Sequence, residues 1–546
     1  MKRKAVAAVL TAVMVASMFT GCGSDNGSSS AKSASAASAA SAANDTVDED
    51  GKVNGIMYQE GLPLVDEGDY TFSIFCDDSS ESGEFIMLDE FKKQTNVDVD
   101  LKIYPYETAT ERLNLDLNSG DYADVIGGWT LSDNAILTYG VNQGVFIPLE
   151  DYFEKYCPNI SAILDLPGVR EKMTAPDGHI YTIPYVCDDT TVGYSPYINT
   201  KWLENVGMSM PTTTDEFEAV LKAFKEQDAN GNGDASDEIP FSTDPNNKRI
   251  EAMAGYFGLP MNKLGIAIQN EKVVYGGVSD TYREFLSWFH KLYAEGLVDV
   301  ELYTQDSSTW EGKGNQDLYG VSIAYGSNEF TGIPAAEERG DFDSMPVLNT
   351  DKDGIWLRDT EGFSVYRTQA VITNKAEHPE IICRWFDNAF ALENGIGCNR
   401  GPVGVIVNKE DDGYHAIDTT TLSEEDQEKY SWGNLWPQSL PKYLPVDFEF
   451  VEEHPMYDEK KATEEAYEAN LTKEIIPSYW IDLDKIDTFS DTNTAIKDFF
   501  EQQQAQFVCG ELDIDNDADW QAYVDGMYSL GLEDWVATQG IEEIAK

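Results

Sequence analysis

Oxygen-bearing side chains alternate along residues 228–238. Asp228, Asn230 and Asn232 stand at the first, third and fifth positions of this run. Gly233 follows at the sixth position, where a calcium loop of the EF-hand type makes its sharp turn. Calcium takes six to eight oxygen ligands, and carboxylates, side-chain amides and backbone carbonyls all supply them. This spacing therefore predicts a bound calcium ion.

The end of this loop differs from the EF-hand pattern. The twelfth position, where a bidentate glutamate is usual, holds Ile239, and the acids come earlier as Asp237 and Glu238. A polar turn without an ion is the alternative, because Asn-Gly pairs are themselves turn signals. We favour calcium, since turn chemistry alone does not require so many alternating oxygen ligands. The predicted metal ligands are Asp228, Asn230, Asn232, Asp234, Asp237 and Glu238.

A second run of alternating acids lies at Asp513–Asp519, but Ala518 stands where the glycine of a calcium loop belongs. Acidic side chains are favourable near the N-terminus of a helix, where the helix dipole is positive. We therefore predict a helix that begins near Trp520 rather than a second metal site.

The N-terminus has the pattern of an export signal. Residues 2–4 are basic, the apolar run Ala5–Phe19 is short for a membrane span, and Cys22 follows soon after. The segment resembles a bacterial lipoprotein signal, in which residues 1–21 are removed and Cys22 becomes the lipidated first residue. An ordinary secretory signal with a chance cysteine is the alternative.

A tether follows the predicted lipid. Residues 22–68 begin with a stretch rich in Ser, Ala and Gly, the composition of a flexible linker. No later apolar run is long enough to span a bilayer. We therefore expect a globular body that contacts a membrane only through its lipid anchor, on the outer face of the cell membrane or its periplasmic side.

Acidic residues dominate the composition. The chain has 98 Asp and Glu against 38 Lys and Arg, a formal net charge of −60. This balance excludes nucleic-acid binding as a main function, because neutralising phosphates needs a basic face. It also disfavours anionic ligands unless a local basic site exists. Tyrosine and tryptophan are plentiful, and we expect most of them in the core and some of them against sugar rings.

Six cysteines remain once Cys22 is assigned to a lipid. Their spacing includes no CxxC cluster, so we do not expect a zinc site. Export permits disulfides, but a body of this size does not need them. We expect mostly buried apolar thiols and leave their pairing open. They are Cys76, Cys157, Cys187, Cys383, Cys398 and Cys509.

The periodicity after the tether alternates between strand and helix. Tyr70–Cys76, Val97–Ile103 and Asp124–Ile126 have the pattern of strands, and Glu84–Thr95 and Thr108–Ser119 that of helices. This order predicts an α/β fold that begins with a parallel, doubly wound sheet. The body is too long for one core, so we expect two lobes.

The predicted sheet also suggests where a ligand binds. In open α/β sheets, ligands bind beyond the carboxyl ends of the strands, which brings the loop at Asp77 and Asp78 close to the loop that follows Ile126. Trp129 comes after two glycines in that second loop. It is a candidate aromatic platform for a sugar, and a core tryptophan at the strand end is the alternative.

Several local patterns together resemble one known family. The helix predicted over Asp215–Gln227, which Thr212 or Thr214 would cap, leads directly into the calcium loop. With the lipoprotein-like start, the chain is similar to extracellular solute-binding proteins of ABC importers, in the carbohydrate branch that includes alginate oligosaccharide-binding proteins. The patterns are Tyr194-Ser195 with Asn199, Lys201, Trp202 and Leu203; Pro211-Thr212 with Asp215-Glu216-Phe217; residues 228–240; Gly312-Lys313 with Gly320-Val321; and Asp519-Trp520 with Gly531-Leu532.

The resemblance implies a two-lobed periplasmic-binding-protein-like fold of type II. Each lobe would hold a mostly parallel sheet flanked by helices, with the ligand cleft between the lobes. The first lobe would comprise residues 69–190 with about 320–373, and the second residues 191–319 with about 374–546. The calcium loop would be structural, with Asp234 binding through its carbonyl. The lobes would close around a sugar or oligosaccharide and present it to the transmembrane subunits of the permease, with the protein acting as a monomer.

The resemblance also guides the choice of cleft residues. Arg400 stands where relatives commonly carry an aromatic residue, and the loop around Trp432 and Trp436 would expose both rings. Aromatic side chains would stack on sugar rings, and Asp78 and Arg400 would bond hydroxyl groups. The predicted cleft residues are Asp78, Trp129, Tyr194, Trp310, Tyr325, Trp356, Arg400, Trp432 and Trp436.

Two other functions compete with sugar binding. A peptide-binding lipoprotein would share the export signal, the tether and the two lobes. A secreted glycoside hydrolase would need two carboxylates across a sugar, but 98 acids make chance pairs unavoidable, and no G-x-S-x-G motif occurs. We therefore predict a binding protein rather than an enzyme.

Overall fold

The computed structural model describes the chain from Asp45 to Ala545, with short gaps. The predicted signal, Cys22 and the first part of the tether lie outside the described residues. Within those residues, no helix combines the length and apolar character that crossing a membrane needs. The described residues are 45–78, 84–244, 250–332, 341–417, 419–445, 448, 450–451, 455–541 and 543–545.

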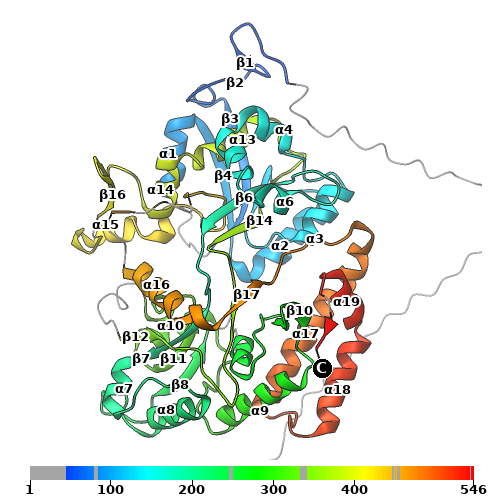
Figure 1. Ribbon diagram of the computed structural model, residues 1–546. Coiled ribbons are helices and arrows are strands. Elements are labelled where there is room, and N and C mark those ends of the chain that lie inside the picture. The colour runs from blue at the N-terminus through cyan, green and yellow to red at the C-terminus, as the bar shows by residue number, and fades with distance from the viewer. Residues whose placement is uncertain are drawn as a thin grey trace, which may run out of the picture. The chain divides into compact units, whose positions relative to one another are not determined.

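A five-stranded sheet organises the first core, in the order β4-β3-β5-β14-β6 (Figure 1). β3 pairs in parallel with β4 and β5, which confirms the predicted doubly wound start. β14 then pairs antiparallel with both β5 and β6. The strands are β3 (Tyr70–Asp77), β4 (Val97–Tyr104), β5 (Val125–Gly127), β6 (Thr182–Asp188) and β14 (Phe363–Ile372).

Helices cover this sheet because each presents an apolar stripe to it. Phe91 and Trp385 pack edge to face, and Trp385 also contacts Phe72 of β3. Asn96 ends α1 in the left-handed conformation, which directs the chain into β4. The helices are α1 (Ile86–Thr95), α2 (Tyr106–Ser119), α4 (Glu150–Tyr156), α5 (Pro158–Leu164), α6 (Val169–Met173), α13 (Pro379–Ala389) and α14 (Leu392–Arg400).

A four-stranded sheet organises the second core, in the order β12-β7-β11-β8. β11 runs parallel to β8, whereas β7 is antiparallel to both β11 and β12. Each large sheet therefore contains one antiparallel strand, β14 or β7, among strands that share one direction, as expected for mostly parallel sheets. The strands are β7 (Ser195–Asn199), β8 (Ile239–Thr243), β11 (Tyr319–Ala324) and β12 (Phe342–Ser344).

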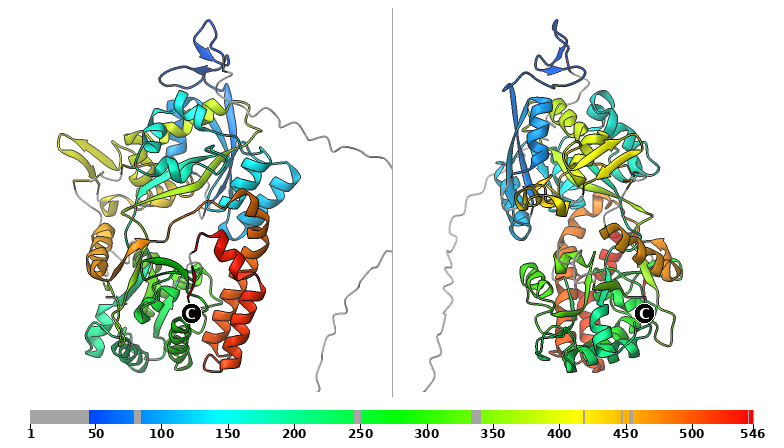
Figure 2. Two further views of the ribbon diagram at one scale, coloured as in Figure 1. Left: turned by 45° about the vertical axis from the view of Figure 1, so that its right-hand side comes forward. Right: turned by 90° about the vertical axis from the view of Figure 1, so that its left-hand side faces the viewer.

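Long amphipathic helices complete the second core. α9 buries Tyr282, Phe285, Phe289 and Leu292 along one face, and the long C-terminal helices α17 and α18 lie side by side (Figure 2). The second acidic run forms the N-terminal end of a helix, as predicted; α18 begins at Asp517, slightly before the expected Trp520, and Asn516 caps it. The helices are α7 (Thr200–Val206), α8 (Thr214–Glu226), α9 (Asp280–Ala294), α10 (Ser307–Asn315), α11 (Asn328–Thr331), α16 (Pro455–Tyr467), α17 (Ile486–Cys509), α18 (Asp517–Ser529) and α19 (Leu532–Thr538).

Helix α8 begins one residue away from either predicted cap. Thr213 Oγ1 accepts the hydrogen bond from Glu216 N, and Thr212 instead donates from its backbone N and its hydroxyl to Glu216 Oε2. This reciprocal arrangement is a variant of the capping box, in which the glutamate reaches back to the residue before the cap.

Smaller β elements surround the two sheets. A three-stranded sheet joins β18 (Glu543–Ile544), β10 (Lys272–Tyr275) and β9 (Ile266–Gln269), and β13 (Trp356–Arg358) pairs with β17 (Leu471–Ile475). Two hairpins complete the set: β1 (Lys52–Val53) with β2 (Met57–Tyr58), and β15 (Val407–Glu410) with β16 (Gly413–Ala416).

The two cores divide the chain differently from the expected lobe boundaries. β11, expected in the first lobe, pairs with β7 and β8 of the four-stranded sheet. Residues 379–400, expected in the second lobe, form helices whose apolar faces join the core of the five-stranded sheet. Strand pairing and the sheet against which the apolar face of α13 packs decide these positions, and both depend on contacts distant in the sequence.

The six cysteines after Cys22 all carry free thiols. Cys76, Cys157, Cys383 and Cys398 are buried, which confirms the expectation for most of them, and Cys509 is exposed.

Candidate functional site

The loop that follows β5 is held in place by Asp77, the last residue of β3. Asp77 Oδ1 accepts the backbone N–H of Trp129 at 2.9 Å, and Oδ2 accepts that of Thr130 at 2.6 Å. Gly128 has φ +135°, and a Cβ there would collide with the Asp77 carboxylate, so only glycine fits. Burial raises the pKa of Asp77. The loop presents Trp129 with 45% of its surface exposed.

Three aromatic rings meet beside this loop. Tyr185 of β6 and Tyr366 of β14 are partners across the antiparallel pair, and their rings stack with centroids 5.5 Å apart. Trp129 meets Tyr366 edge to face at 5.2 Å and Tyr185 at 6.4 Å. We call Trp129, Tyr185 and Tyr366 the aromatic cluster. It is a polarised, partly exposed surface of the kind that packs against the C–H face of a sugar ring.

A buried lysine extends the cluster on one side. Lys442 Nζ lies 5.8 Å from the centre of the Tyr185 ring and 5.4 Å from that of Trp432. Burial lowers the pKa of Lys442 to about 8. Trp432 is 52% exposed, so it is a second accessible ring within reach of the ammonium.

Asp189 joins the cluster to the four-stranded sheet. Its Oδ2 accepts the hydroxyls of Ser364 at 2.5 Å and Tyr366 at 3.2 Å, both from β14. Its Oδ1 accepts the hydroxyl of Tyr325, which follows β11, at 3.5 Å. Tyr325 in turn packs edge to face against Tyr194, with centroids 5.9 Å apart. One carboxylate therefore connects aromatic residues that belong to both sheets.

Segments that pass between the sheets are tied together beside Tyr325. Lys460 of α16 donates to the Gly193 carbonyl at 2.7 Å, and the Gly193 N–H donates to Asp359 Oδ2 at 2.8 Å. Glu464, one turn further along α16, accepts both the backbone N–H and the hydroxyl of Thr191. We call this set of contacts the hinge clasp, because it joins the segment between β6 and β7, the segment before β14, and α16.

The structure brings part of the predicted cleft set together. Trp129, Tyr194, Tyr325 and Trp432 lie along the line of contacts that runs from Trp432 through the aromatic cluster to Tyr194. Asp78 is buried at the same end of the sheet, and its Oδ2 accepts the Gln438 N–H at 2.8 Å. Arg400 is half-buried, with its guanidinium 5.8 Å from the centre of the Phe450 ring.

Three predicted cleft tryptophans are core residues instead. Trp310 is 3% exposed and donates its indole N–H to Ser322 Oγ at 3.1 Å. Trp356 packs edge to face on Tyr467, and Trp436 stacks on Trp385 in the core of the five-stranded sheet. The expectation that Trp432 and Trp436 are both exposed was therefore wrong for Trp436, because the turn between them directs one ring inward.

Sequence reasoning missed Tyr185, Tyr366, Asp189, Lys442 and Lys460. Ser364 and Tyr366 stand two residues apart on β14, so strand alternation places them on one face, and this signal could have been used. Lys442 lies outside the helices and strands, and Lys460 lies on α16; their places beside the aromatic residues depend on contacts distant in the sequence.

The loop at 228–238 folds around its own polar groups. Asp228 Oδ2 accepts the Gly233 N–H at 3.0 Å, and Asn230 and Asn232 direct their amide nitrogens to the carboxylate of Asp237. Glu238 Oε1 accepts the Ala229 N–H at 2.9 Å, which closes the loop.

Two oxygens of this loop are suited to a cation. Asp228 Oδ1 and Glu238 Oε2 are buried and have no hydrogen-bond partner within the described part of the chain. Burial raises the pKa of Glu238, as expected for a carboxylate without a counter-charge. A buried carboxylate oxygen without a donor is costly, and a hard cation would relieve that cost, so the donor set fits calcium.

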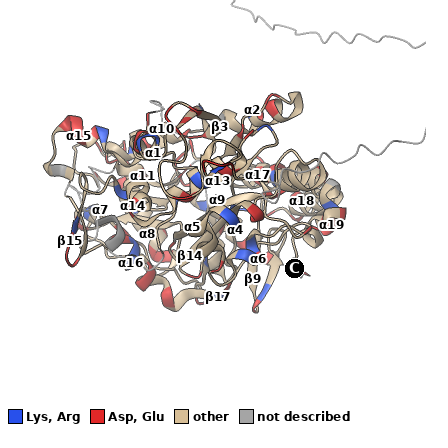
Figure 3. Cartoon of the chain, turned by 90° about the horizontal axis from the view of Figure 1, so that it is seen from above, with Lys and Arg blue, Asp and Glu red and all other residues tan. Residues whose placement is uncertain are grey.

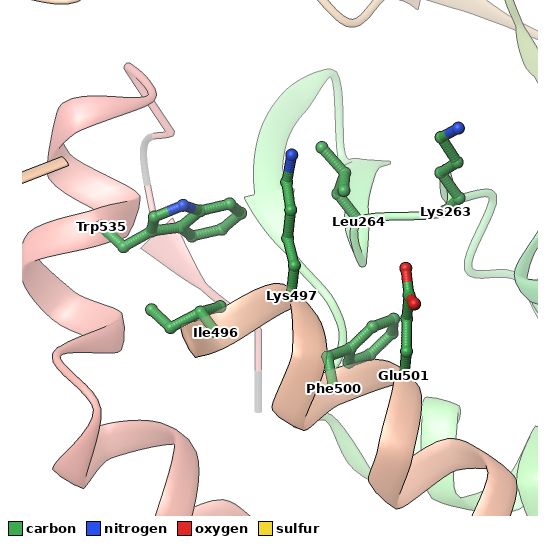
Figure 4. Close-up of a pocket in the computed structure, with 7 residues that line it drawn as sticks. All are labelled: Lys263, Leu264, Ile496, Lys497, Phe500, Glu501 and Trp535. Carbon is green, nitrogen blue, oxygen red and sulfur yellow. The ribbon is translucent and has the colours of Figure 1, made fainter. Parts of the chain in front are cut away.

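The small hollow between α17 and the β9 end of the three-stranded sheet is separate from this site (Figure 4). The aliphatic stem of Lys497 and the rings of Phe500 and Trp535 line it, and none of the residues described above contributes to it. It carries no part of the argument for a ligand.

A family model for bacterial extracellular solute-binding proteins matches residues 78–395. The chain belongs to this family. Among solute-binding proteins, the fructooligosaccharide ABC transporter substrate-binding protein FusA of Streptococcus pneumoniae serotype 4 is 31% identical over 411 residues. The match covers 73% of this chain and 70% of FusA.

Solved structures of this solute-binding family share the fold. The structure of S. pneumoniae FusA in complex with kestose is similar with a TM-score of 0.76 and 26% identity, covering 86% of this chain and 98% of that one. An EF-hand mutant of FusA in complex with fructo-nystose gives a TM-score of 0.73 and 27% identity, with the same coverage. The α/β fold expected from the sequence is therefore confirmed as that of a solute-binding protein.

Proposed function

We propose that the protein is the substrate-binding component of an ABC importer and captures a sugar or oligosaccharide on the aromatic cluster. The observation that carries this proposal is the arrangement of Trp129, Tyr185 and Tyr366 beside Asp189. Flat aromatic faces beside carboxylate acceptors match a sugar, which presents C–H groups on its faces and hydroxyl groups at its edges.

The relatives support an oligosaccharide as the ligand. The FusA structures hold kestose and fructo-nystose, and this chain aligns along nearly all of their length. The line of rings from Trp432 to Tyr194 offers more than one stacking position, which suits a ligand of several units. We therefore propose a short neutral oligosaccharide as the substrate class.

Delivery to the permease would require the five-stranded and four-stranded sheets to move relative to each other. The ligand would bind between the five-stranded and four-stranded sheets, and Asp189 with the hinge clasp lies where the chain passes from one to the other. Closure around the sugar would present a combined surface to the transmembrane subunits of the permease.

The position of the protein follows from its predicted N-terminus. Cys22 would carry a lipid, residues 22–68 would act as the tether, and the body would work as a monomer at the outer or periplasmic face of the membrane. Seen from above, Asp and Glu lie on several elements, including α15 (Glu424–Lys429), with Lys and Arg interspersed among them (Figure 3).

The calcium loop would have a structural role. It follows α8 and leads into β8, so an ion there would fix the turn between a core helix and a strand of the four-stranded sheet. The aromatic cluster lies on the other sheet, and calcium would therefore stabilise the fold without contacting the sugar.

Titration calorimetry with a ligand panel tests this function. The panel should contain kestose, other neutral oligosaccharides and mixed peptides, and we expect binding only among the sugars. Peptide binding with no response to any sugar would support the peptide-binding alternative. Continuous release of shorter sugars from a bound oligosaccharide would instead indicate a glycoside hydrolase.

A further inference from the structure

Lys442 is buried in an unusual setting for a charged side chain. Only 2% of the residue is exposed, yet its ammonium lies within 5.8 Å of the ring centre of Tyr185 and within 5.4 Å of that of Trp432. An ammonium has three N–H donors. Among the described residues, one acceptor, Gln438 Oε1, lies within hydrogen-bond distance, at 2.5 Å. Two donors are therefore directed elsewhere.

The charges around Lys442 do not neutralise it by direct pairing. The titratable and charged groups that face it are Asp78 after β3, Cys187 of β6, and Cys398 and Arg400 of α14. Within the described chain, the direct partner of its ammonium is the side-chain amide oxygen of Gln438 rather than a carboxylate. A buried cation in this state is costly unless further acceptors satisfy its donors.

Its neighbours connect Lys442 to the rest of the site. Gln438 accepts from Lys442 through its side chain, and its backbone N–H donates to Asp78 Oδ2. Tyr185 packs against the ammonium and also stacks on Tyr366 of the aromatic cluster. A sugar unit placed against this cluster would bring its oxygens next to the lysine.

We propose that Lys442 is a specificity-determining residue, whose ammonium donates hydrogen bonds to two neighbouring oxygens of a neutral sugar unit held between Tyr185 and Trp432. This inference rests on the proposed function and names the residue that donates hydrogen bonds to the sugar. Neighbouring hydroxyls accept from one ammonium readily, and each can donate onward to a carboxylate such as Asp78. Sugars without two adjacent oxygens at this unit are excluded, since they would leave the buried donors unpaired.

Calorimetry with kestose on the purified chain, between pH 6.5 and pH 10, tests the proposal. Because the pKa of Lys442 is about 8, the ammonium is lost across this range. We expect the affinity of the wild-type protein to fall about tenfold from pH 7 to pH 10. Lys442→Met should bind at least tenfold more weakly at pH 7 and lose this pH dependence.

A matched control separates this effect from general loss of a lysine. Lys497→Met makes the same change in a partly buried lysine of α17, and it should keep both the affinity and the pH profile. Lys460 also has a pKa of about 8, so the pH profile is measured in Lys460→Met as well and should persist there. Lys442→Gln, which keeps a polar side chain at the site, is the second variant if Lys442→Met folds poorly.

Two results would overturn the proposal. Wild-type binding that stays constant from pH 7 to pH 10, with Lys442→Met equally tight, would remove the role of Lys442 and leave the sugar-binding function intact. A wild-type protein that binds no sugar of the panel at any pH would overturn both.

Discussion

The Lys460 ammonium lies 3.7 Å from the centre of the Tyr325 ring. This is a close cation–π contact, and burial lowers the pKa of the lysine to about 8. The same ammonium donates to the Gly193 carbonyl, so a single side chain of α16 holds both a ring of the proposed binding site and a segment that joins the two sheets. The proposed ligand site and the hinge clasp are therefore physically connected.

Lys460→Met tests this connection. The variant keeps the apolar stem but removes the hydrogen bond to Gly193 and the charge over Tyr325. We expect faster amide hydrogen exchange in residues 189–194, and sugar affinity reduced several-fold, measured by mass spectrometry and calorimetry. Lys461→Met, a change at the exposed neighbouring residue, is the control. Unchanged exchange in Lys460→Met would show that the clasp does not depend on this lysine.

Trp129→Ala removes the most exposed ring of the aromatic cluster. Because this ring is 45% exposed, stability should change little. Sugar affinity should fall about tenfold, or about 1.4 kcal/mol, as expected for the loss of one stacking contact. Tyr528→Ala on α18 removes a ring of similar exposure, 42%, and should leave affinity unchanged. Equal affinity in Trp129→Ala would place the ligand elsewhere.

Trp310→Ala should lower stability and leave sugar affinity unchanged, which is the reverse of the result expected for Trp129→Ala. The residue is buried against Phe330, so its truncation leaves a cavity that costs about 3–5 kcal/mol of unfolding free energy. We expect a lower melting temperature by calorimetry, with sugar affinity retained in the folded fraction. A stable Trp310→Ala protein with weakened sugar binding would indicate that Trp310 contacts the sugar, as the sequence had predicted.

Glu329 makes the stability of the protein depend on pH. Burial raises its pKa to about 7 from the ordinary 4.5, with Asp244, Glu311 and Lys460 as the charged groups that face it. The folded state therefore holds this proton more tightly than the unfolded state. The stabilisation is complete below pH 4.5 and is lost as the pH rises through 7, by up to about 3 kcal/mol at 1.36 kcal/mol per pKa unit.

Glu329→Gln should remove that part of the pH dependence. Denaturant unfolding at pH 5 and pH 7.5 should show a smaller loss of stability in the variant than in the wild-type protein. Glu465→Gln changes an exposed carboxylate of α16 and controls for the altered net charge. If Glu329→Gln and the wild-type protein lose stability equally between these pH values, Glu329 is not the source of the pH dependence.

Removing calcium should lower stability and spare ligand binding. An ion at one hundred times its Kd stabilises a folded protein by about 2.7 kcal/mol, so a chelator should lower the melting temperature by a few degrees. Sugar affinity should change less than twofold. Asp228→Ala should abolish the response to the chelator, and Asp515→Ala in the second acidic run should retain it. A wild-type melting temperature that does not change when the chelator is added would exclude a bound ion.

Sequence reasoning predicted the local elements well and the long-range contacts poorly. β3, α1, β4 and β5 follow from periodicity, because alternation and apolar stripes are local properties. Trp129 followed from its place at a strand end. Trp436 and Trp310 were placed wrongly, since burial depends on partners such as Trp385 and Ser322 that are distant in sequence or across a turn. Lys442 and Lys460 lie beside Tyr185 and Tyr325 because of long-range contacts that the sequence does not show.

The position of β14 limits the order in which the protein can fold. It lies between β5 and β6, although the chain makes both of those strands long before it reaches Phe363. All strands of the four-stranded sheet are made in the interval. The N-terminal part therefore cannot complete its sheet as it emerges, and a fragment ending at Asp188 would leave two strand edges unpaired. A chain that must be complete before its first sheet closes remains unfolded for longer, which suits passage through an export channel.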